Sequence, residues 1–365
     1  MWLTRRELVA STLVAGRAGQ AAGPPSKLGM PGPYPGRVIA VHHPASIVSG
    51  AYQAEAIRGM MRKGMMELTG APGWVDAWRV FAEPGDVVGI KVCPVGGRRL
   101  CSDATVLNEI IEGLKQAGVR PRDIVICNRY RQEIVGAGIH KWLPEGVRYT
   151  WACEAYDKVQ LAIDGYDPEV YLDIPIIKPG QDPREPRFRR SYVARFLTQQ
   201  MNKFINLPVL KHHSSAGVTL ALKNMTYGMV NNVNRSHQTG PNGLMNACGV
   251  FIAALADLPV FRQKAVLHIL DGIKGGYEDG PGVSPKYIWE HKTLYFATDP
   301  VAVDRVGWKV IDEKRVAEGL QPVALAKSNR GGYLNMQPEH IEFAGALGLG
   351  VFEDAKIELR KIGLG

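Results

Sequence analysis

The sequence is poor in cysteine and has no long hydrophobic run. Its five cysteines are scattered over 365 residues without CxxC spacing, which argues against a disulfide framework, a zinc ribbon or an iron–sulfur cluster. One pair, Cys93 with Cys101, stays open as an alternative in an oxidising compartment. The best apolar stretch, 247–256, ends at Asp257, whereas a membrane-spanning helix needs about 20 residues. We therefore predict a protein without a transmembrane span.

Common catalytic motifs are missing as well. The chain has no HEXXH, no GxSxG, no GxxxxGK[ST] phosphate loop and no GxGxxG after its first predicted strand. Each of these motifs sets a metal ligand, a nucleophile or a phosphate-binding backbone at fixed spacing. We expect neither NAD nor an iron–sulfur cluster as a cofactor, and the cofactor stays unknown, with a divalent metal ion as one alternative.

The positive charge is concentrated in short segments. The chain has 44 Lys and Arg against 35 Asp and Glu, a formal net charge of +9. Residues 178–195 hold six basic residues and two acidic ones, and residues 1–26 hold three basic residues and one acidic one. Because the excess is local, it does not predict specific nucleic-acid binding. Binding of an anionic polymer through 178–195, where Phe188 and Tyr192 stand among arginines, remains an alternative.

The N-terminus is typical of an export signal. Residues 1–26 contain the pair Arg5 and Arg6, a short apolar run and a small-residue tract, which is the layout of a bacterial twin-arginine signal peptide. The prediction is a periplasmic or otherwise exported protein that uses the twin-arginine export machinery. An amphipathic N-terminal helix is the alternative. The Gly/Pro-rich residues 27–36 are expected to form a flexible leader.

From residue 37 to residue 365, short β-branched runs alternate with amphipathic helical stretches. This rhythm predicts an α/β domain with a mainly parallel sheet flanked by helices, in one lobe or two. Residues 140–195 are less regular and are expected to form an insertion or a lid. The expected strands are 37–43, 87–93, 123–127, 204–210, 265–270 and 293–298.

Polar residues follow these strands at their carboxyl ends, where parallel α/β sheets bind ligands. In the first cluster, Lys91 lies near the end of its strand, and Gly96 and Gly97 come next. An ammonium group inside an apolar run needs water, a carboxylate or an anionic ligand, and glycine lets the backbone approach a ligand closely. We predict that these three residues bind substrate, the alternative being a lysine that reaches solvent.

The second cluster follows the apolar run FINLPVL. Lys211, His212 and His213 lie in an expected turn, and Lys223 and Asn224 lie in the next helix. Two ammonium groups near one helix N-terminus suit an anion, and a neutral imidazole can bind a metal or move a proton. Because side chains alternate along an extended chain, at most one histidine should face the site.

The third and fourth clusters are acidic. Asp271 opens the glycine-rich loop 270–282, which contains Gly280 and is expected to be mobile and to cover the ligand. Asp299 reads as a helix cap. Asp304 lies about 140° further around that helix, so it is the better candidate to pair with a lysine or a metal.

These residues resemble a known family. The strand GIKV, the block NLPVLKHH with GVTLALKNMTYG, the loop DGIKGGYEDGPG, the segment ATDPVAVD and the tail EFAGALGLGVFEDAKIEL together span 87–358. In this order they resemble the domain of unknown function 362 family. The resemblance implies an α/β fold and a site location, without a defined reaction. Some relatives carry a ferredoxin-like cluster domain, but this chain lacks the cysteines for one.

The leading hypothesis is an exported enzyme that acts on a small anionic substrate, with carboxylate or phosphate held by lysines. One of several neighbouring lysines is expected to have a lowered pKa and to act as a base or as an imine-forming amine. The predicted catalytic residues are Lys211, His212, His213, Lys223 and Asp271, and the predicted substrate-binding residues are Lys91, Gly96, Gly97, Asn224 and Gly280.

The alternative from another class is a cell-envelope protein that binds a metal ion or a metallated cofactor. Its predicted ligands are His212, Asp271 and Asp304. Imidazole and carboxylate are common ligands of divalent metals, which is why this set is kept beside the small anionic ligand.

Overall fold

The computed structural model describes residues 26–237, 246–327 and 335–365, so the predicted signal peptide lies outside the described residues except for Ser26. The centre of the molecule is a ten-stranded sheet in the order β14-β1-β13-β12-β9-β4-β5-β6, with β10 attached to β12 and β11 attached to β10. The strands of this sheet are β1 (Arg37–His42), β4 (Val88–Val92), β5 (Ile124–Tyr130), β6 (Arg148–Cys153), β9 (Lys203–Leu207), β10 (Val209–His213), β11 (Gly217–Val218), β12 (Ala265–Gly276), β13 (Ile288–Ala297) and β14 (Glu358–Gly363).

Most neighbouring strands of the sheet are parallel. Parallel pairing joins β14 to β1 and links β12, β9, β4, β5 and β6, whereas β13 is antiparallel to both β1 and β12. The parallel strands therefore end at one common edge of the sheet. The predicted α/β class with a mainly parallel sheet flanked by helices is confirmed, and two further two-stranded sheets accompany the ten-stranded one in the described residues.

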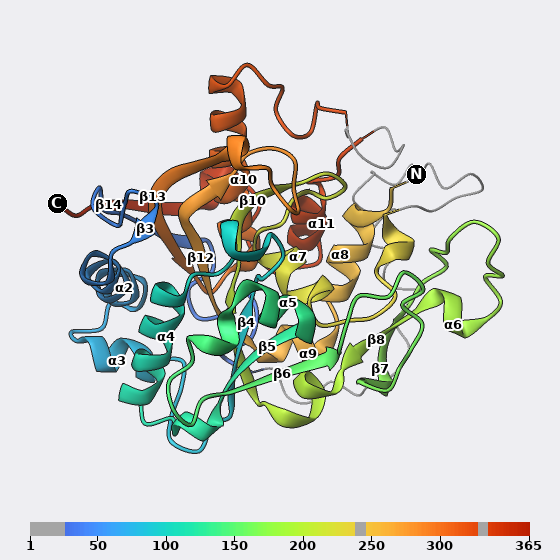
Figure 1. Cartoon of the computed structure of the whole chain (residues 1–365), viewed down its shortest axis with the longest axis horizontal. Helices are drawn as coiled ribbons and strands as arrows, with labels where there is room; N and C mark the ends of the chain where they lie inside the picture. Colours follow the sequence, from blue (N-terminus) through green and yellow to red (C-terminus); the bar gives the residue numbers. More distant parts are fainter. Residues whose placement is uncertain (1–25, 238–245, 328–334) are drawn as a thin grey trace.

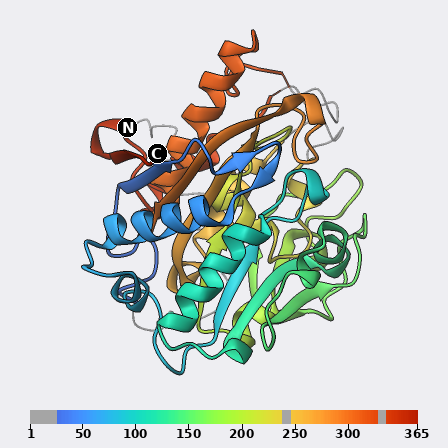
Figure 2. The ribbon, with the colours of Figure 1, turned by 60° about the vertical axis from the view of Figure 1, so that its left-hand side comes forward.

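Helices cover both faces of this sheet (Figure 1), and α2 lies across the strands in Figure 2. On one face, α2, α3 and α4 pack on the strands, and the methionine stripe of α2 is core, since Met60, Met61 and Met65 are fully buried. On the other face lie α7, α8, α10 and α11. The helices are α2 (Ala54–Thr69), α3 (Trp74–Arg79), α4 (Ala104–Gln116), α5 (Arg131–Ala137), α6 (Pro186–Arg189), α7 (Leu220–Tyr227), α8 (Cys248–Ala256), α9 (Pro259–Lys264), α10 (Pro300–Ala317) and α11 (His340–Ala346).

The chain bends between β9 and β10, and the polar residues of β10 follow this bend. β9 pairs with the first half of β12, β10 pairs with its second half, and Pro208 separates them. Lys211, His212 and His213 therefore lie in a strand and not in the expected turn. Because both neighbours of β12 offer it backbone partners, residues up to Gly276 of the expected mobile loop are also strand.

Residues 27–36, expected to be a flexible leader, pack against the domain. Met30 is buried, and its N–H donates to the carbonyl of Arg262 at 2.7 Å. The N–H of Gly36 donates to the carboxylate of Asp299 at 2.9 Å. These long-range bonds give the segment a fixed place on the core.

Part of the segment 140–195 lies outside the main sheet. After β6, the chain forms the antiparallel pair β7 (Tyr166–Asp173) and β8 (Arg190–Ala194), with α6 between them, to the right in Figure 1. The buried guanidinium of Arg235 fixes this pair to the core by donating to the carbonyls of Ile174 and Ile176 at 2.8 and 2.6 Å.

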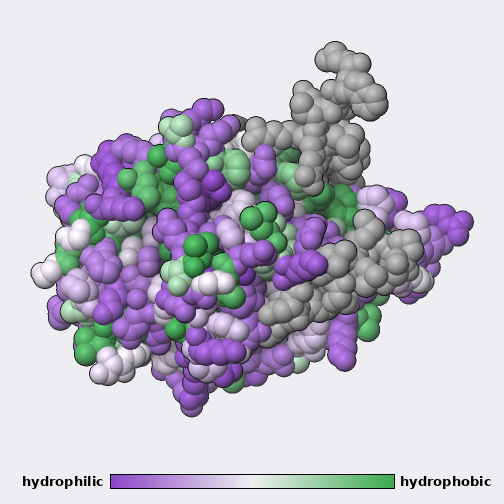
Figure 3. Space-filling model, turned by 90° about the horizontal axis from the view of Figure 1, so that it is seen from above, coloured by the Kyte–Doolittle hydropathy of each residue, from purple (hydrophilic) through white to green (hydrophobic). Residues whose placement is uncertain are grey.

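No helix within the described ranges is both long and apolar enough to cross a bilayer. On the face shown in Figure 3, hydrophobic residues form separate patches among hydrophilic ones.

Candidate functional site

A cavity of about 200 Å³ lies at the carboxyl edge of the sheet, where β4, β5 and β10 end against α7. We call it the lysine cavity because Lys91 of β4, Lys211 of β10 and Lys223 of α7 all line it. Asn224, next to Lys223, lines it as well. With His213 of β10, the structure thus brings together five of the residues that the sequence singles out, from three separate elements.

At the start of α7 the chain turns sharply and then forms part of the cavity wall. Leu220 is buried with φ of +44°, in the left-handed region that costs a non-glycine residue energy. The carboxylate of Asp304 accepts hydrogen bonds from the backbone N–H groups of Ala221 and Leu222 at 2.6 and 2.8 Å. Asp304 therefore caps the N-terminus of α7 from another helix. This corrects the prediction that Asp304 pairs with a lysine or a metal. It also corrects the prediction that this helix N-terminus binds an anionic ligand, because the Asp304 carboxylate occupies it.

Lys91 supplies positive charge from a fully bonded ammonium group. Its Nζ donates to the carbonyl of Val92 at 2.5 Å, to Asn128 Oδ1 at 3.0 Å and to Asn224 Oδ1 at 3.2 Å. Burial lowers its pKa. A Cβ on Gly228 would lie 2.1 Å from Lys91 Cε, so only glycine leaves room for this side chain.

Lys211 joins two loops across the cavity. Its Nζ donates to the carbonyl of Val95, in the loop after β4, and to that of Pro281 at 3.2 Å. An ammonium group has three N–H donors, so one of them is left for a ligand.

Lys223 differs from the other two lysines because it has no hydrogen-bond or ion-pair partner among the described residues. Its Nζ lies 4.5 Å from the centre of the Tyr227 ring, a cation–π contact. Burial lowers its pKa to about 8, and the charge of Lys211 adds to this effect. Burial, more than repulsion between lysines, is therefore the main cause of the lowered pKa that the sequence predicts.

Only one of the two adjacent histidines lines the cavity, because side chains alternate along β10. His213 Nδ1 accepts from the N–H groups of Ser215 and Ala216 at 3.1 and 3.2 Å, so its ring proton is on Nε2. His213 stacks on His237, with ring centres 5.6 Å apart. Burial lowers the pKa of His213 well below its usual range and that of His237 to about 3, so both rings are neutral donors or acceptors.

His212 points to the opposite side of β10. Its Nδ1 accepts from the N–H of Gly280 at 3.1 Å, and its Nε2 lies 3.0 Å from Met336 Sδ. A Cβ on Gly280 would overlap the His212 carbonyl at 1.7 Å. Gly280 thus serves close packing of this loop on β10, and Pro281 is the loop residue that lines the cavity. Glu278 pairs with the buried Arg315 of α10, which holds the loop down.

The predicted metal ligands are not brought together. His212 lies behind β10, Asp304 caps α7, and Asp271 accepts hydrogen bonds from the N–H groups of Ile273 and Asp103 at 3.1 and 3.4 Å. No group of three or more His, Cys, Asp or Glu suited to a metal ion occurs in the part of the chain that the structure describes. Burial, with the nearby Asp103 carboxylate, raises the pKa of Asp271 to about 7. The geometry of the described residues thus gives no support to the proposed ligand set.

Gly96 and Gly97 do not line the cavity, although both follow the strand that carries Lys91. They have φ of +121° and +61°, and they turn the chain at the start of a short 3₁₀ helix, Gly97–Arg99. Val95, directly before them, supplies the carbonyl that Lys211 binds. Their role here is to shape the loop that holds Lys211.

Four residues at or just after the end of β5 are not among those predicted from the sequence. Asn128, Arg129, Tyr130 and the following Glu133 all line the cavity. The strand expected from the sequence ends at residue 127, so the polar sequence NRY that follows is not predicted to be a cluster at a strand end. The rule that ligands bind at the carboxyl ends of parallel strands nevertheless applies to it. Asn128 links Lys91 to this cluster by donating to Glu133 Oε2 at 2.7 Å.

Arg129 presents a buried cation with free donors. Its Nε donates to Tyr166 Oη at 3.3 Å, and its guanidinium lies 4.6 Å from the centre of the Tyr130 ring. Within the described residues, its two terminal nitrogens have no acceptor. A guanidinium fork of this kind matches a carboxylate in a bidentate arrangement.

Two buried hydroxyl groups of the cavity residues also lack partners among the described residues. They are Tyr130 Oη and Thr219 Oγ1. Burial raises the pKa of Tyr130 well above its usual range, so this hydroxyl stays protonated. Because most buried polar groups in proteins are bonded, these two hydroxyls and the free donors of Lys223 and Arg129 make the lysine cavity the candidate site for a ligand.

A larger cavity, of about 460 Å³, lies between α10 and the strands β1, β13 and β14. Several of its polar groups bond to one another: His291 Nε2 lies 2.6 Å from Tyr295 Oη, and Lys309 pairs with Asp354 at 2.8 Å. It has no cluster of buried cations, and so the smaller lysine cavity is the stronger candidate.

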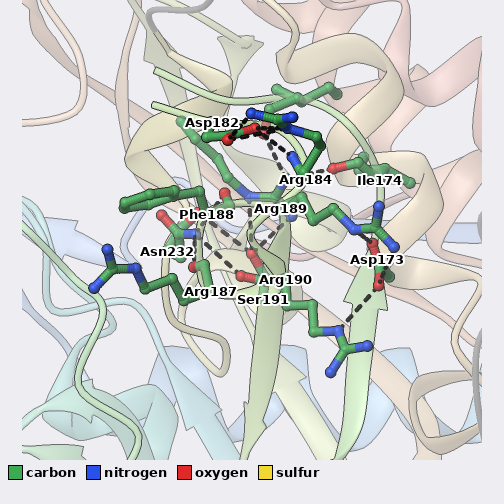
Figure 4. A network of polar contacts seen from close by, with 12 residues as sticks. Asp173, Ile174, Asp182, Arg184, Arg187, Phe188, Arg189, Arg190, Ser191 and Asn232 are labelled. Carbon is green, nitrogen blue, oxygen red and sulfur yellow. Dashed lines mark hydrogen bonds and ion pairs between the residues drawn. The ribbon is translucent and has the colours of Figure 1, made fainter. Parts of the chain in front are cut away.

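The arginine segment, residues 178–195, carries its charge differently (Figure 4). Arg184 pairs with Asp182 at 2.8 Å, and Arg187 pairs with Glu185 at 2.7 Å. Asp173 of β7 accepts both Arg189 and Arg190, at 2.6 and 3.0 Å. These four arginines are largely neutralised by carboxylates of their own segment and of β7, which weakens the hypothesis of an anionic-polymer site.

The fold and the site together define an α/β protein with a buried cationic cavity at the carboxyl edge of its sheet. The model of the family described as Domain of unknown function (DUF362) matches residues 96–309, and the chain belongs to this family. A crystal structure of a Thermotoga maritima protein from a structural genomics consortium aligns over 74% of this chain with 13% sequence identity and a TM-score of 0.40. This chain covers 60% of that protein's chain. No curated protein matches the sequence.

Proposed function

We propose that the protein is an enzyme that acts on a small carboxylate substrate bound in the lysine cavity. The observation that carries this proposal is an imbalance of charge. Of the described residues that line the cavity, four are cations, namely Lys91, Lys211, Lys223 and Arg129, and one, Glu133, is a carboxylate. A buried charge without a partner costs several kcal/mol, and an anionic ligand supplies that partner.

Some of the four cations can donate hydrogen bonds to the ligand, and Lys91 acts on it only through its charge. Arg129 offers its two free terminal nitrogens, and Lys211 offers its third N–H. Lys91 has no free donor, so it contributes its charge at a distance. The Nε2–H of His213 adds a neutral donor.

Lys223 gives the cavity a group that can change its protonation state during a reaction. With its pKa at about 8, a fraction on the order of a tenth is neutral near pH 7. A group poised in this way exchanges a proton with substrate at low cost. This property favours an enzyme over a protein that only binds an anion.

The test is isothermal titration calorimetry of the whole protein with oxalate and with pyruvate. We expect binding of at least one of them, and R129Q should weaken it on the order of 10-fold or more, since a hydrogen bond to a charged group contributes about 1.5–3 kcal/mol. The matched control is R184Q, which removes an exposed arginine paired with Asp182 and should leave the affinity unchanged. Wild-type protein that binds neither acid, or equal affinity in R129Q, would refute the proposal.

We also propose that the protein is exported by the twin-arginine route. The support is the sequence alone, namely the pair Arg5 and Arg6 ahead of a short apolar run and small residues. Cell fractionation in a bacterial host with this route tests it. We expect the wild-type chain outside the cytoplasm and the variant R5K/R6K retained inside, and identical distribution of the two would count against export by this route.

A further inference from the structure

We infer that the Lys223 amine forms an imine with the carbonyl carbon of a small 2-oxo acid. The inference rests on the proposed function, because it takes a small carboxylate as given and adds the chemical class of that acid and the atom with which it reacts. It depends on how Lys223 is held, on the free donors around it, and on the size of the cavity.

The bonding of Lys223 sets it apart from the lysines beside it. Lys91 is tied to three acceptors and Lys211 to two backbone carbonyls. A lysine needed only for its charge is well served by such anchors. The Lys223 side chain is buried, contacts the Tyr227 ring and has no acceptor among the described residues. Its nitrogen lone pair, once the proton has left, is therefore not blocked by an existing bond.

The surroundings favour the neutral amine that such a reaction requires. Desolvation in an apolar or cationic setting is the usual way in which proteins activate a lysine nucleophile. The pKa of Lys223, at about 8, reflects burial first and the charge of Lys211 next among the groups that lower it. The titratable groups that act on this amine or line the cavity with it are Lys91, Cys93, Arg129, Tyr130, Glu133, Tyr156, Lys211, His213, Tyr227, His237 and Cys248.

The other free donors fit the rest of a 2-oxo acid. Arg129 presents a fork for the carboxylate, and it lines the same cavity as Lys223. The unpartnered hydroxyls of Tyr130 and Thr219 are available to the oxygen that the carbonyl bears. A volume of about 200 Å³ limits the acid to a few carbons.

The reaction balances without any further reagent. The nitrogen lone pair forms the C–N bond, the carbonyl π pair moves to oxygen, and that oxygen takes one proton from nitrogen. Loss of the resulting hydroxyl together with the second nitrogen proton releases one water and leaves a C=N bond. Nothing is oxidised or reduced, and the two amine protons and the carbonyl oxygen leave as water.

Borohydride trapping tests this step on the whole protein. The wild type is incubated with pyruvate and sodium borohydride, and the trapped adduct is located by peptide mass mapping. We expect one adduct, on Lys223, in the wild type and in the control K286R, which alters an exposed lysine outside the cavity. We expect none in K223R, whose fold is checked by thermal unfolding. Acetone, which has the carbonyl group but no carboxylate, should give no adduct at the same concentration.

The outcomes separate the two proposals. Pyruvate that binds in calorimetry without any trapped adduct on Lys223 overturns the imine and leaves the proposed function standing. Failure of pyruvate and oxalate to bind overturns both. An adduct on another lysine, or one that persists in K223R, overturns the assignment to Lys223.

Discussion

The lysine cavity and the arginine segment are both rich in basic residues, but they hold their charge in opposite ways. In the arginine segment, Arg184 and Arg187 have side chains that are 89% and 66% exposed, and each is paired with a carboxylate. In the lysine cavity, Lys223 and Arg129 are buried and face no carboxylate of their own. The difference lies in burial and pairing, and not in the number of positive charges.

This difference indicates where to look for function in a basic protein. Exposed ion pairs contribute about 0–1 kcal/mol and are screened by salt, so the arginine segment makes a small contribution to stability and a weak field. Unpaired buried cations lower stability, and proteins keep such destabilising arrangements mainly at functional sites. The lysine cavity fits this description, and four variants or conditions test it against the arginine segment.

The largest effect is expected from G228A. The new methyl group would overlap the end of the Lys91 side chain, with 2.3 Å to Nζ, so the ammonium group must leave the position in which it makes its three hydrogen bonds. We expect the free energy of unfolding to fall by about 2–4 kcal/mol in urea denaturation. The control G136A, in α5, meets nothing within 4 Å and should be neutral or slightly stabilising. Equal stability of the two variants would show that Lys91 is not fixed in the cavity.

K223M should make the protein more stable while it abolishes imine formation. Lys223 has a pKa of about 8 when folded and near 10.5 when unfolded. Between about pH 8 and pH 10.5, Lys223 is protonated in the unfolded chain but largely neutral in the folded one, so the free energy of unfolding of the wild type rises with pH in this range. Near pH 7 the amine is charged in both states, and the folded state carries the full cost of burying that charge. Removing the charge should raise the free energy of unfolding near pH 7 on the order of 1–3 kcal/mol, with a smaller gain above about pH 10.

Denaturant unfolding at both pH values measures this effect, with K286M as the exposed control. A loss of stability in K223M near neutral pH would mean that Lys223 has a stabilising partner, and the contrast with the arginine segment would then fail.

Oxalate binding should weaken as the pH rises above about 8. Oxalate has no ketone, so it reports on charge without imine formation, and an anion beside Lys223 favours the protonated amine. Above the pKa of about 8, binding must bring a proton with it, and the affinity should fall by up to about tenfold per pH unit. His213 and His237 do not contribute, because burial lowers the pKa of each. Calorimetry should find weaker and pH-independent binding in K223M; a wild-type affinity that stays flat to about pH 10 would remove Lys223 from the site.

Local patterns in the sequence were enough for the fold class but not for the connections between strands. Buried apolar runs and helical periodicity are local, so the strands around Lys91 and residues 124–127 and the helix over 104–116 follow from them. The reversed direction of β13 and the start of β10, up to Lys211, depend on pairing with β12, which no local pattern contains. Five glycines in 270–282 suggested a loop, yet backbone partners on both sides make its first part a strand.

Site residues that lie at the carboxyl ends of parallel strands could be predicted from the sequence. Residues whose role depends on a partner far away along the chain could not. Lys91, Lys211 and Lys223 meet because parallel strands end at one edge. Arg129 was missed only because its strand is longer than its apolar run. Asp304 looked free in the sequence because its partners, the first N–H groups of α7, lie more than 80 residues away along the chain.

The smallest effect is expected from the double variant R184Q/R187Q, which removes two exposed charges of the arginine segment. Each loses an ion pair with a neighbouring carboxylate, so stability should change by no more than about 0.5–1 kcal/mol and oxalate affinity should stay the same. Heparin binding by the wild type, measured over a range of salt, is the decisive control. A result against the comparison would be heparin binding that is tight, falls steeply with salt as polyanion binding does and is lost in the double variant. The ion pairs of the arginine segment would then open to bind a ligand, and pairing with carboxylates would no longer distinguish the arginine segment from the lysine cavity.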